Sequence, residues 1–172
     1  MASSTSSCSS KQVLTANGTR IQALLVDDDE EFCNLLKELL EPCGVDIKAV
    51  TDPVEALEIF TREKDNFHLV LLDYYMPHLN GTQMWGRLKE LNPNVKVILV
   101  SAVDEFRLKQ ILAQCPMDGY IRKPFRIRVA IEVIRHVMTQ TGQSLLPTEL
   151  PTAFKSNVIG DGRRAGNGRG CG

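Results

Sequence analysis

The 172-residue chain has none of the features that mark membrane or secreted proteins. No apolar run approaches the roughly 20 residues of a transmembrane helix, and the N-terminus lacks the continuous apolar stretch of a secretory signal. Its five cysteines are odd in number, scattered and without a C-x-x-C pair. A disulfide framework and a zinc site are therefore not indicated, and we expect reduced thiols and a cytoplasmic location.

Net charge is close to zero overall but is unevenly distributed along the chain. Residues 21–140 carry 14 basic and 19 acidic residues, whereas the rest of the chain carries 6 and 2. Because affinity for duplex nucleic acid depends on clustered Lys and Arg, the acidic central part argues against a nucleic-acid-binding face there. The 33 residues after Thr139 contain no helix-turn-helix pattern, so we expect no DNA-binding domain.

Composition divides the chain into three segments. Residues 1–20 are rich in Ser and Thr, contain no acidic residue and are predicted to be disordered, with a short organelle-targeting segment as the alternative. Residues 21–140 form the predicted folded domain. Residues 141–172 are predicted to be a flexible tail containing Pro, Gly and Arg, because the last 13 residues alone hold six glycines and three arginines.

Two hydrophobic patterns alternate five times between residues 21 and 139. Short apolar runs predict buried strands, and longer segments with apolar residues three and four apart predict amphipathic helices. The predicted strands are 21–26, 45–50, 69–72, 95–100 and 119–121, and the predicted helices are 30–40, 53–63, 81–91, 105–114 and 127–139. This alternation predicts an α/β fold with a parallel sheet covered by helices on both faces.

Polar residues follow four of the five predicted strands, at the carboxyl ends where open parallel α/β sheets carry their functional groups. They are Asp27, Asp28 and Asp29 after the first strand, Asp73 after the third, Ser101 after the fourth and Lys123 after the fifth. Carboxylates gathered at one edge repel one another unless a cation lies among them, and oxygen ligands at a partly solvated site favour Mg²⁺ or Mn²⁺. The hydroxyl and the ammonium group suit a phosphoryl group, so the set predicts phosphoryl transfer to Asp73.

Four motifs at these strand ends together resemble the receiver domain of two-component response regulators. They are V-D-D-D after the first strand, L-D-Y-Y-M-P-H-L-N-G around Asp73, S-A after the fourth strand and Y-I-R-K-P-F after the fifth. Each motif alone is weak, but all four in order over residues 21–138 are specific. The resemblance implies a stand-alone receiver with a flavodoxin-like, doubly wound, five-stranded parallel sheet in the order 2-1-3-4-5 and five helices.

The resemblance also implies how the carboxylates act. Asp73 would be the phosphoacceptor, taking its phosphoryl group from a phosphohistidine of a histidine kinase or a histidine phosphotransfer protein in a phosphorelay. The metal ligands would be Asp28 directly, Asp27 mainly through water, Asp73 itself and the backbone carbonyl of Tyr75. Such a protein is an enzyme only in the limited sense that it catalyses its own phosphorylation and dephosphorylation.

Four further positions receive roles from the same resemblance. Lys123 would contact the phosphoryl group, or Asp73 in its absence, and Ser101 would donate a hydrogen bond to a phosphoryl oxygen. Ala102 is small enough to leave access to the site. Ser101 and Tyr120 would form the switch that changes the surface of the fourth helix, fifth strand and fifth helix. An unknown downstream protein or a second copy of the chain would bind that surface.

Some residues depart from the family pattern or allow other interpretations. Asp29 is expected to cap the first helix rather than bind metal, and Asp104 is better placed than Ser101 to cap the fourth. Tyr75 and Val103 are bulky and not acidic, so we expect slow hydrolysis of the phosphorylated form. A pseudo-receiver that binds partners without phosphate is one alternative. A haloacid-dehalogenase-like phosphohydrolase is another, although that family needs an aspartate where Tyr75 stands.

Overall fold

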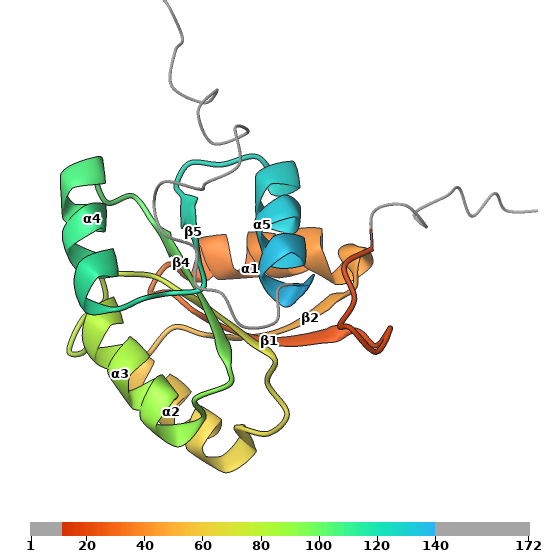
Figure 1. Cartoon of the computed structure of the whole chain (residues 1–172), viewed down its shortest axis with the longest axis horizontal. Coiled ribbons are helices and arrows are strands. Elements are labelled where there is room, and N and C mark those ends of the chain that lie inside the picture. The colour runs from red at the N-terminus through yellow and green to blue at the C-terminus, as the bar shows by residue number, and fades with distance from the viewer. Residues whose placement is uncertain (1–11, 140–172) are drawn as a thin grey trace, which may run out of the picture.

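Five parallel strands form the centre of the computed structural model, which describes residues 12–139, with helices on both faces of the sheet (Figure 1). The strands are β1 (Ile21–Val26), β2 (Val45–Val50), β3 (Leu69–Leu72), β4 (Lys96–Ser101) and β5 (Gly119–Arg122). Their order is β2-β1-β3-β4-β5, which confirms the predicted fold class and strand order. The predicted tail, residues 141–172, lies outside the described residues.

The helices are α1 (Glu30–Leu40), α2 (Pro53–Glu63), α3 (Gly81–Leu91), α4 (Glu105–Gln114) and α5 (Ile127–Thr139), with a 3₁₀ turn, η1 (Glu41–Cys43), after α1. Side chains cap the first turns of α1, α2, α3 and α4. Asp29 accepts a hydrogen bond from the backbone N–H of Phe32 at 2.9 Å, and Asp104 accepts one from that of Arg107 at 2.8 Å. Both predicted N-caps are therefore confirmed, and each carboxylate binds a backbone N–H in the first turn of its helix.

Apolar side chains pack in two main clusters, one on each face of the sheet. α1 and α5 cover one face, and α2 and α3 cover the other (Figure 1). A third, smaller cluster lies beneath α4, and its members come from the ends of β3, β4 and β5 as well as from α4 itself. The carboxyl ends of β1, β3, β4 and β5 are therefore held by packed helices on both sides, which fixes the positions of the residues that follow them.

The N-terminal boundary of the packed chain differs from the sequence prediction. Val13 belongs to the segment predicted to be disordered, yet its side chain is 1% exposed and joins the α1–α5 cluster. Its backbone N–H donates to the carbonyl of Cys43 at 2.7 Å. Gly44, at φ 96°, makes this approach possible, since a Cβ there would lie 2.6 Å from the Val13 carbonyl oxygen. Val13 and Leu14 stand in an otherwise polar stretch and form no periodic pattern, so the sequence alone did not indicate the burial of Val13.

The cysteines of the described residues are buried thiols. They are Cys33, Cys43 and Cys115, and none of them forms a disulfide. Burial raises the pKa of Cys33 to about 12, with a further contribution from the charge of Asp27, and burial also raises the pKa of Cys115. The reduced state expected from the sequence stays a prediction. Within residues 12–139, no helix has both the length and the apolar content needed to cross a bilayer.

Candidate functional site

Three carboxylates meet at the carboxyl edge of the sheet, as the sequence predicted. Asp27 and Asp73 directly follow β1 and β3, which are neighbours in the sheet, and the backbone N–H of Asp73 donates to the carbonyl of Val26 at 2.9 Å. One oxygen from each of Asp27, Asp28 and Asp73 lies within 4.8 Å of the others. Asp27 is 1% and Asp73 6% exposed, whereas Asp28 faces solvent. The cluster is therefore buried on one side and open on the other.

Lys123 joins this cluster from the loop after β5. Its Nζ lies 2.5 Å from Oδ2 of Asp27 and 3.6 Å from Oδ1 of Asp73. The sequence predicted contact with Asp73, and the structure adds that Asp27 is the closer partner. Nζ also lies 4.0 Å from the centroid of the Phe32 ring of α1, and that ring makes an edge-to-face contact with Phe125. Packing from two elements thus holds the ammonium group over the carboxylates.

The electrostatics of the site leave negative charge uncompensated. Burial raises the pKa of Asp27, the hydrogen bond and charge of Lys123 act in the opposite direction, and the charge of Asp73 adds to the rise. Within the described residues, Lys123 is the cation that contacts these carboxylates. A buried carboxylate beside two others therefore shares one ammonium group, an arrangement that a divalent cation would relieve.

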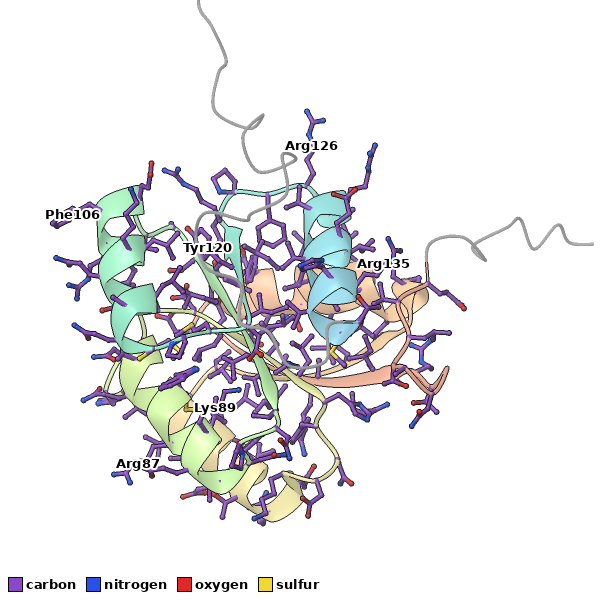
Figure 2. All side chains as sticks on the ribbon, viewed as in Figure 1. Arg87, Lys89, Phe106, Tyr120, Arg126 and Arg135 are labelled. Atoms are coloured by element: carbon purple, nitrogen blue, oxygen red, sulfur yellow. The ribbon has the colours of Figure 1, made fainter. Side chains whose placement is uncertain are left out.

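Ser101 and Tyr120 lie on the other side of the site, at the ends of β4 and β5. Ser101 is 0% exposed, and its Oγ has no hydrogen-bond partner among the described residues. The hydroxyl of Tyr120, which lies between α4 and α5 in Figure 2, donates to the carbonyls of Ser101 at 3.1 Å and Val103 at 3.3 Å. Burial raises the pKa of Tyr120 to about 12. A buried hydroxyl without a partner is costly, so Ser101 is ready to bind a ligand oxygen.

The donor set fits a hard divalent cation. Its ligands are all oxygen atoms, and the exposure of Asp28 leaves room for the water molecules that Mg²⁺ retains. The Tyr75 side chain is 59% exposed, and its backbone N–H donates to Oδ2 of Asp73 at 2.9 Å. This bond fixes the loop that carries the Tyr75 carbonyl, whose role as a metal ligand stays a prediction.

Sequence reasoning missed three residues that shape the site. Gly81 begins α3 against the loop that starts at Asp73, and a Cβ there would lie 2.8 Å from the carbonyl oxygen of Asp73. Tyr74, next to Asp73, accepts a hydrogen bond from Arg107 of α4 at 2.7 Å. For Gly81, the Asn80-Gly81 pair at the start of a predicted helix was an available signal. For Tyr74 and Arg107 the sequence held none, because the two residues share no pattern.

An apolar groove of about 470 Å³ borders Lys123 and was not predicted. Leu35 and Leu39 of α1, one helical turn apart, are 55% and 41% exposed on its wall. The groove is lined by Phe32, Leu35, Leu36 and Leu39 from α1, and by Ala102, Lys123, Pro124, Phe125 and Ile127 from the loops and α5. Exposed leucines beside a charged site indicate a docking surface.

Comparisons with known proteins agree with this geometry. Chemotaxis protein CheY of Halobacterium salinarum is 32% identical over 118 residues, covering 69% of this chain and 97% of that protein. Putative two-component response regulator ARR21 of Arabidopsis thaliana is 30% identical over 132 residues, covering 76% of this chain but only 21% of that protein. The solved CheX-CheY-BeF3-Mg+2 complex from Borrelia burgdorferi matches with a TM-score of 0.66 and 25% identity, covering 72% of this chain and 93% of that one.

The curated relatives are often longer than the matched region, since the chain spans 21% of ARR21 and 54% of Regulatory protein VanRB of Enterococcus faecalis. The family model for the response regulator receiver domain matches residues 23–135, which include all of the site residues named above. The chain therefore belongs to the response regulator receiver domain family.

Proposed function

We propose that Asp73 accepts a phosphoryl group from a phosphohistidine of a histidine kinase or a histidine phosphotransfer protein. The observation that carries this proposal is the cluster of three carboxylates within 4.8 Å of one another that shares Lys123. A carboxylate oxygen of Asp73 attacks phosphorus in line, and the bond between phosphorus and the imidazole nitrogen breaks. Its electron pair stays on the imidazole, which leaves as a neutral ring because its other nitrogen already carries a proton.

The surrounding side chains support this transfer by binding the phosphoryl oxygens. The ammonium group of Lys123 is already held at the site and neutralises charge on the phosphoryl group. The Ser101 hydroxyl, which lacks a partner among the described residues, donates to another oxygen, and the small Ala102 leaves that side accessible. When bound at Asp27, Asp28 and Asp73, Mg²⁺ or Mn²⁺ would add the positive charge that phosphoryl transfer requires.

The apolar groove beside Lys123 supports a protein, rather than a small molecule, as the physiological donor. Its walls expose Leu35 and Leu39 next to the phosphoacceptor site, and apolar side chains of a helical partner would remove them from water. Docking there would bring a histidine on the partner toward Asp73. Two-component systems pair receiver domains with such donors.

Output is proposed to occur through the surface of α4, β5 and α5. Phe106 of α4 is 73% exposed and projects away from the sheet (Figure 2), which supports contact with a downstream protein or with a second copy of the chain. The activity of any longer relative does not transfer to this chain, because several of them extend far beyond the matched region. A cytoplasmic location stays a prediction.

Phosphorylation of the intact protein tests the proposal. The chain is incubated with Mg²⁺ and acetyl phosphate or phosphoramidate, and its intact mass is followed with time. We expect a gain of one phosphoryl group that is lost without Mg²⁺ and in Asp73→Asn, but kept in Asp65→Asn, whose carboxylate is exposed and outside the site. No gain with any donor, in a folded protein, would favour the phosphate-independent pseudo-receiver instead.

The phosphohydrolase alternative is not favoured. The chain belongs to the receiver family over residues 23–135, and Tyr75 occupies the position at which a haloacid-dehalogenase-like enzyme needs its second aspartate.

A further inference from the structure

We propose that the hydrogen bond between Tyr74 and Arg107 is a second link between the phosphoacceptor and α4, separate from Tyr120, and that it favours the ligand-bound form of the site. The proposal rests on the proposed function, because it takes Asp73 as the phosphoacceptor. It assigns a positioning role to two residues that have no part in the phosphoryl chemistry itself.

Tyr74 is placed to transmit a change at Asp73, because it is the next residue in the chain. Its side chain is 6% exposed and lies in the cluster beneath α4. The Tyr74 hydroxyl accepts a hydrogen bond from Nη2 of Arg107 at 2.7 Å, and the guanidinium carbon lies 5.5 Å from the ring centroid. Within residues 12–139 Arg107 forms no ion pair, and its other side-chain bond goes to Gln110. The tyrosine is therefore the main anchor of this cation.

The contact completes a continuous series of bonds between the two halves of the phosphoryl site. Arg107 also donates its backbone N–H to the capping carboxylate of Asp104 at 2.8 Å. The preceding residue, Val103, accepts a hydrogen bond from Tyr120, which also binds the carbonyl of Ser101. In order, the connected residues are Asp73, Tyr74, Arg107, Asp104, Val103, Tyr120 and Ser101. α4 is thus attached to the phosphoacceptor at one end of the series and to the phosphate-binding serine at the other.

Weak apolar anchoring makes α4 sensitive to such a bond. Only Leu108 and Ile111 of α4 are buried, whereas α5 buries five residues. A hydrogen bond from a charged donor is therefore a large share of what holds the start of α4 in place. In this position of α4 the Tyr120 side chain is buried against the carbonyls of Ser101 and Val103, and the Ser101 hydroxyl is left open to a ligand oxygen. Because coupling between sites is reciprocal, a bond that favours this position of α4 also favours a ligand that binds at Asp73 and Ser101.

A double-mutant cycle with a phosphoryl mimic tests the proposal. Beryllofluoride with Mg²⁺ is titrated calorimetrically into the wild-type protein, Tyr74→Phe, Arg107→Ala and the double variant. We expect each single variant to bind about three- to tenfold more weakly, and the double variant to be no weaker than the weaker single one, since both remove the same bond. Arg107→Lys, which keeps a charged donor, should recover most of the affinity. Arg128→Ala, an exposed arginine of α5, is the matched control and should bind normally.

Unchanged or tighter binding in the single variants would overturn the proposal, as would losses that simply add in the double variant. If wild type itself fails to bind beryllofluoride, the proposed function fails and the link is judged on the ligand-free protein. Hydrogen exchange of the Leu108 and Ile111 amides should then be faster in Tyr74→Phe and in Arg107→Ala, with urea unfolding confirming that both variants fold. Wild-type exchange rates in either folded variant would refute the link.

Discussion

Replacing Asp27 by Asn should stabilise the metal-free protein and weaken its response to Mg²⁺. The Asp27 carboxylate is 1% exposed, and burial raises its pKa. A carboxyl group whose pKa is higher in the folded state binds its proton more tightly there, so its ionisation costs stability as the pH rises. The Asn variant carries no such charge. The advantage of the variant should therefore be absent below about pH 4 and grow as the pH rises through the elevated pKa of Asp27.

The size of the effect depends on the balance between burial of Asp27 and its contact with Lys123. Burial is the largest influence and raises the pKa, the hydrogen bond and charge of Lys123 lower it by less in total, and the charge of Asp73 adds a small rise. In the variant Lys123 keeps its contact with Asp73, so its ammonium group is not left without a carboxylate. We therefore expect a gain of about 1–2 kcal/mol at pH 7 in the free energy of unfolding, the low end of what removal of buried charge gives when no charged partner is left unpaired. For a domain of this size that corresponds to a rise in Tm of about 4–8 °C.

Unfolding by urea in EDTA and in excess Mg²⁺ measures both effects. Wild type should gain about 2.7 kcal/mol when Mg²⁺ is at 100 times its Kd, whereas the variant, which lacks one ligand, should gain less. Asp65→Asn is the control and should behave as wild type under both conditions. The reasoning is refuted if Asp27→Asn is less stable than wild type in EDTA at pH 7, or if both proteins gain equally from Mg²⁺.

Three further predictions concern the surroundings of the site and the N-terminal contact. Gly81→Ala should lower the free energy of unfolding by about 1–3 kcal/mol and slow phosphorylation measured by intact mass, because the new Cβ would press on the Asp73 carbonyl; a normal phosphorylation rate would contradict this. Val13→Ala should cost about 1–2 kcal/mol in urea unfolding, and no loss would mean that Val13 does not belong to the core. Tyr75→Asn should speed loss of the phosphoryl group several-fold without affecting folding, since the side chain is 59% exposed, and decay at the wild-type rate would remove the explanation for slow hydrolysis.

Val103 is unsuitable for the same test. Val103, like Tyr75, is bulky and not acidic, so Val103→Glu would be the matching substitution for testing the expected slow hydrolysis. The structure shows Val103 to be 2% exposed and part of the cluster beneath α4. A glutamate there would bury a carboxylate without a partner, so any change in dephosphorylation would be mixed with a loss of stability.

The sequence predicted the site well where one rule connects residues that are distant in the chain. Parallel strands end at a common edge, so Asp27 and Asp73 could be placed together from the apolar runs before them. Helix starts were equally predictable, because Asp29 and Asp104 bond to backbone groups only three residues away. In both cases the information is either local or set by the topology as a whole.

Other features depend on how particular side chains meet, and no sequence pattern contains that information. Lys123 lies closer to Asp27 than to Asp73, with its ammonium group over the Phe32 ring, and this arrangement depends on how α1 packs beside the loop after β5. The Tyr74–Arg107 contact joins an aromatic residue to an exposed helix position. Either side chain could form hydrogen bonds with water instead, so the sequence does not pair them. Val13 required a glycine at Gly44 for its contact, which becomes evident only when the two segments are seen together.

The buried thiols can be used to measure how often the structure around them opens. Alkylating reagents attack the thiolate, and Cys33 is both shielded and, with its pKa raised to about 12, almost entirely protonated at neutral pH. Its Sγ donates to the carbonyl of Asp27 at 3.4 Å, so α1 must move away from the carboxylate cluster before a reagent can reach it. The labelling rate of Cys33 would then measure how often this edge of the sheet opens. The labelling rate of Cys115, directly after α4, would measure how often the region around α4 opens. Comparing the two rates with and without a phosphoryl group would show which of the two regions phosphorylation makes more or less prone to open.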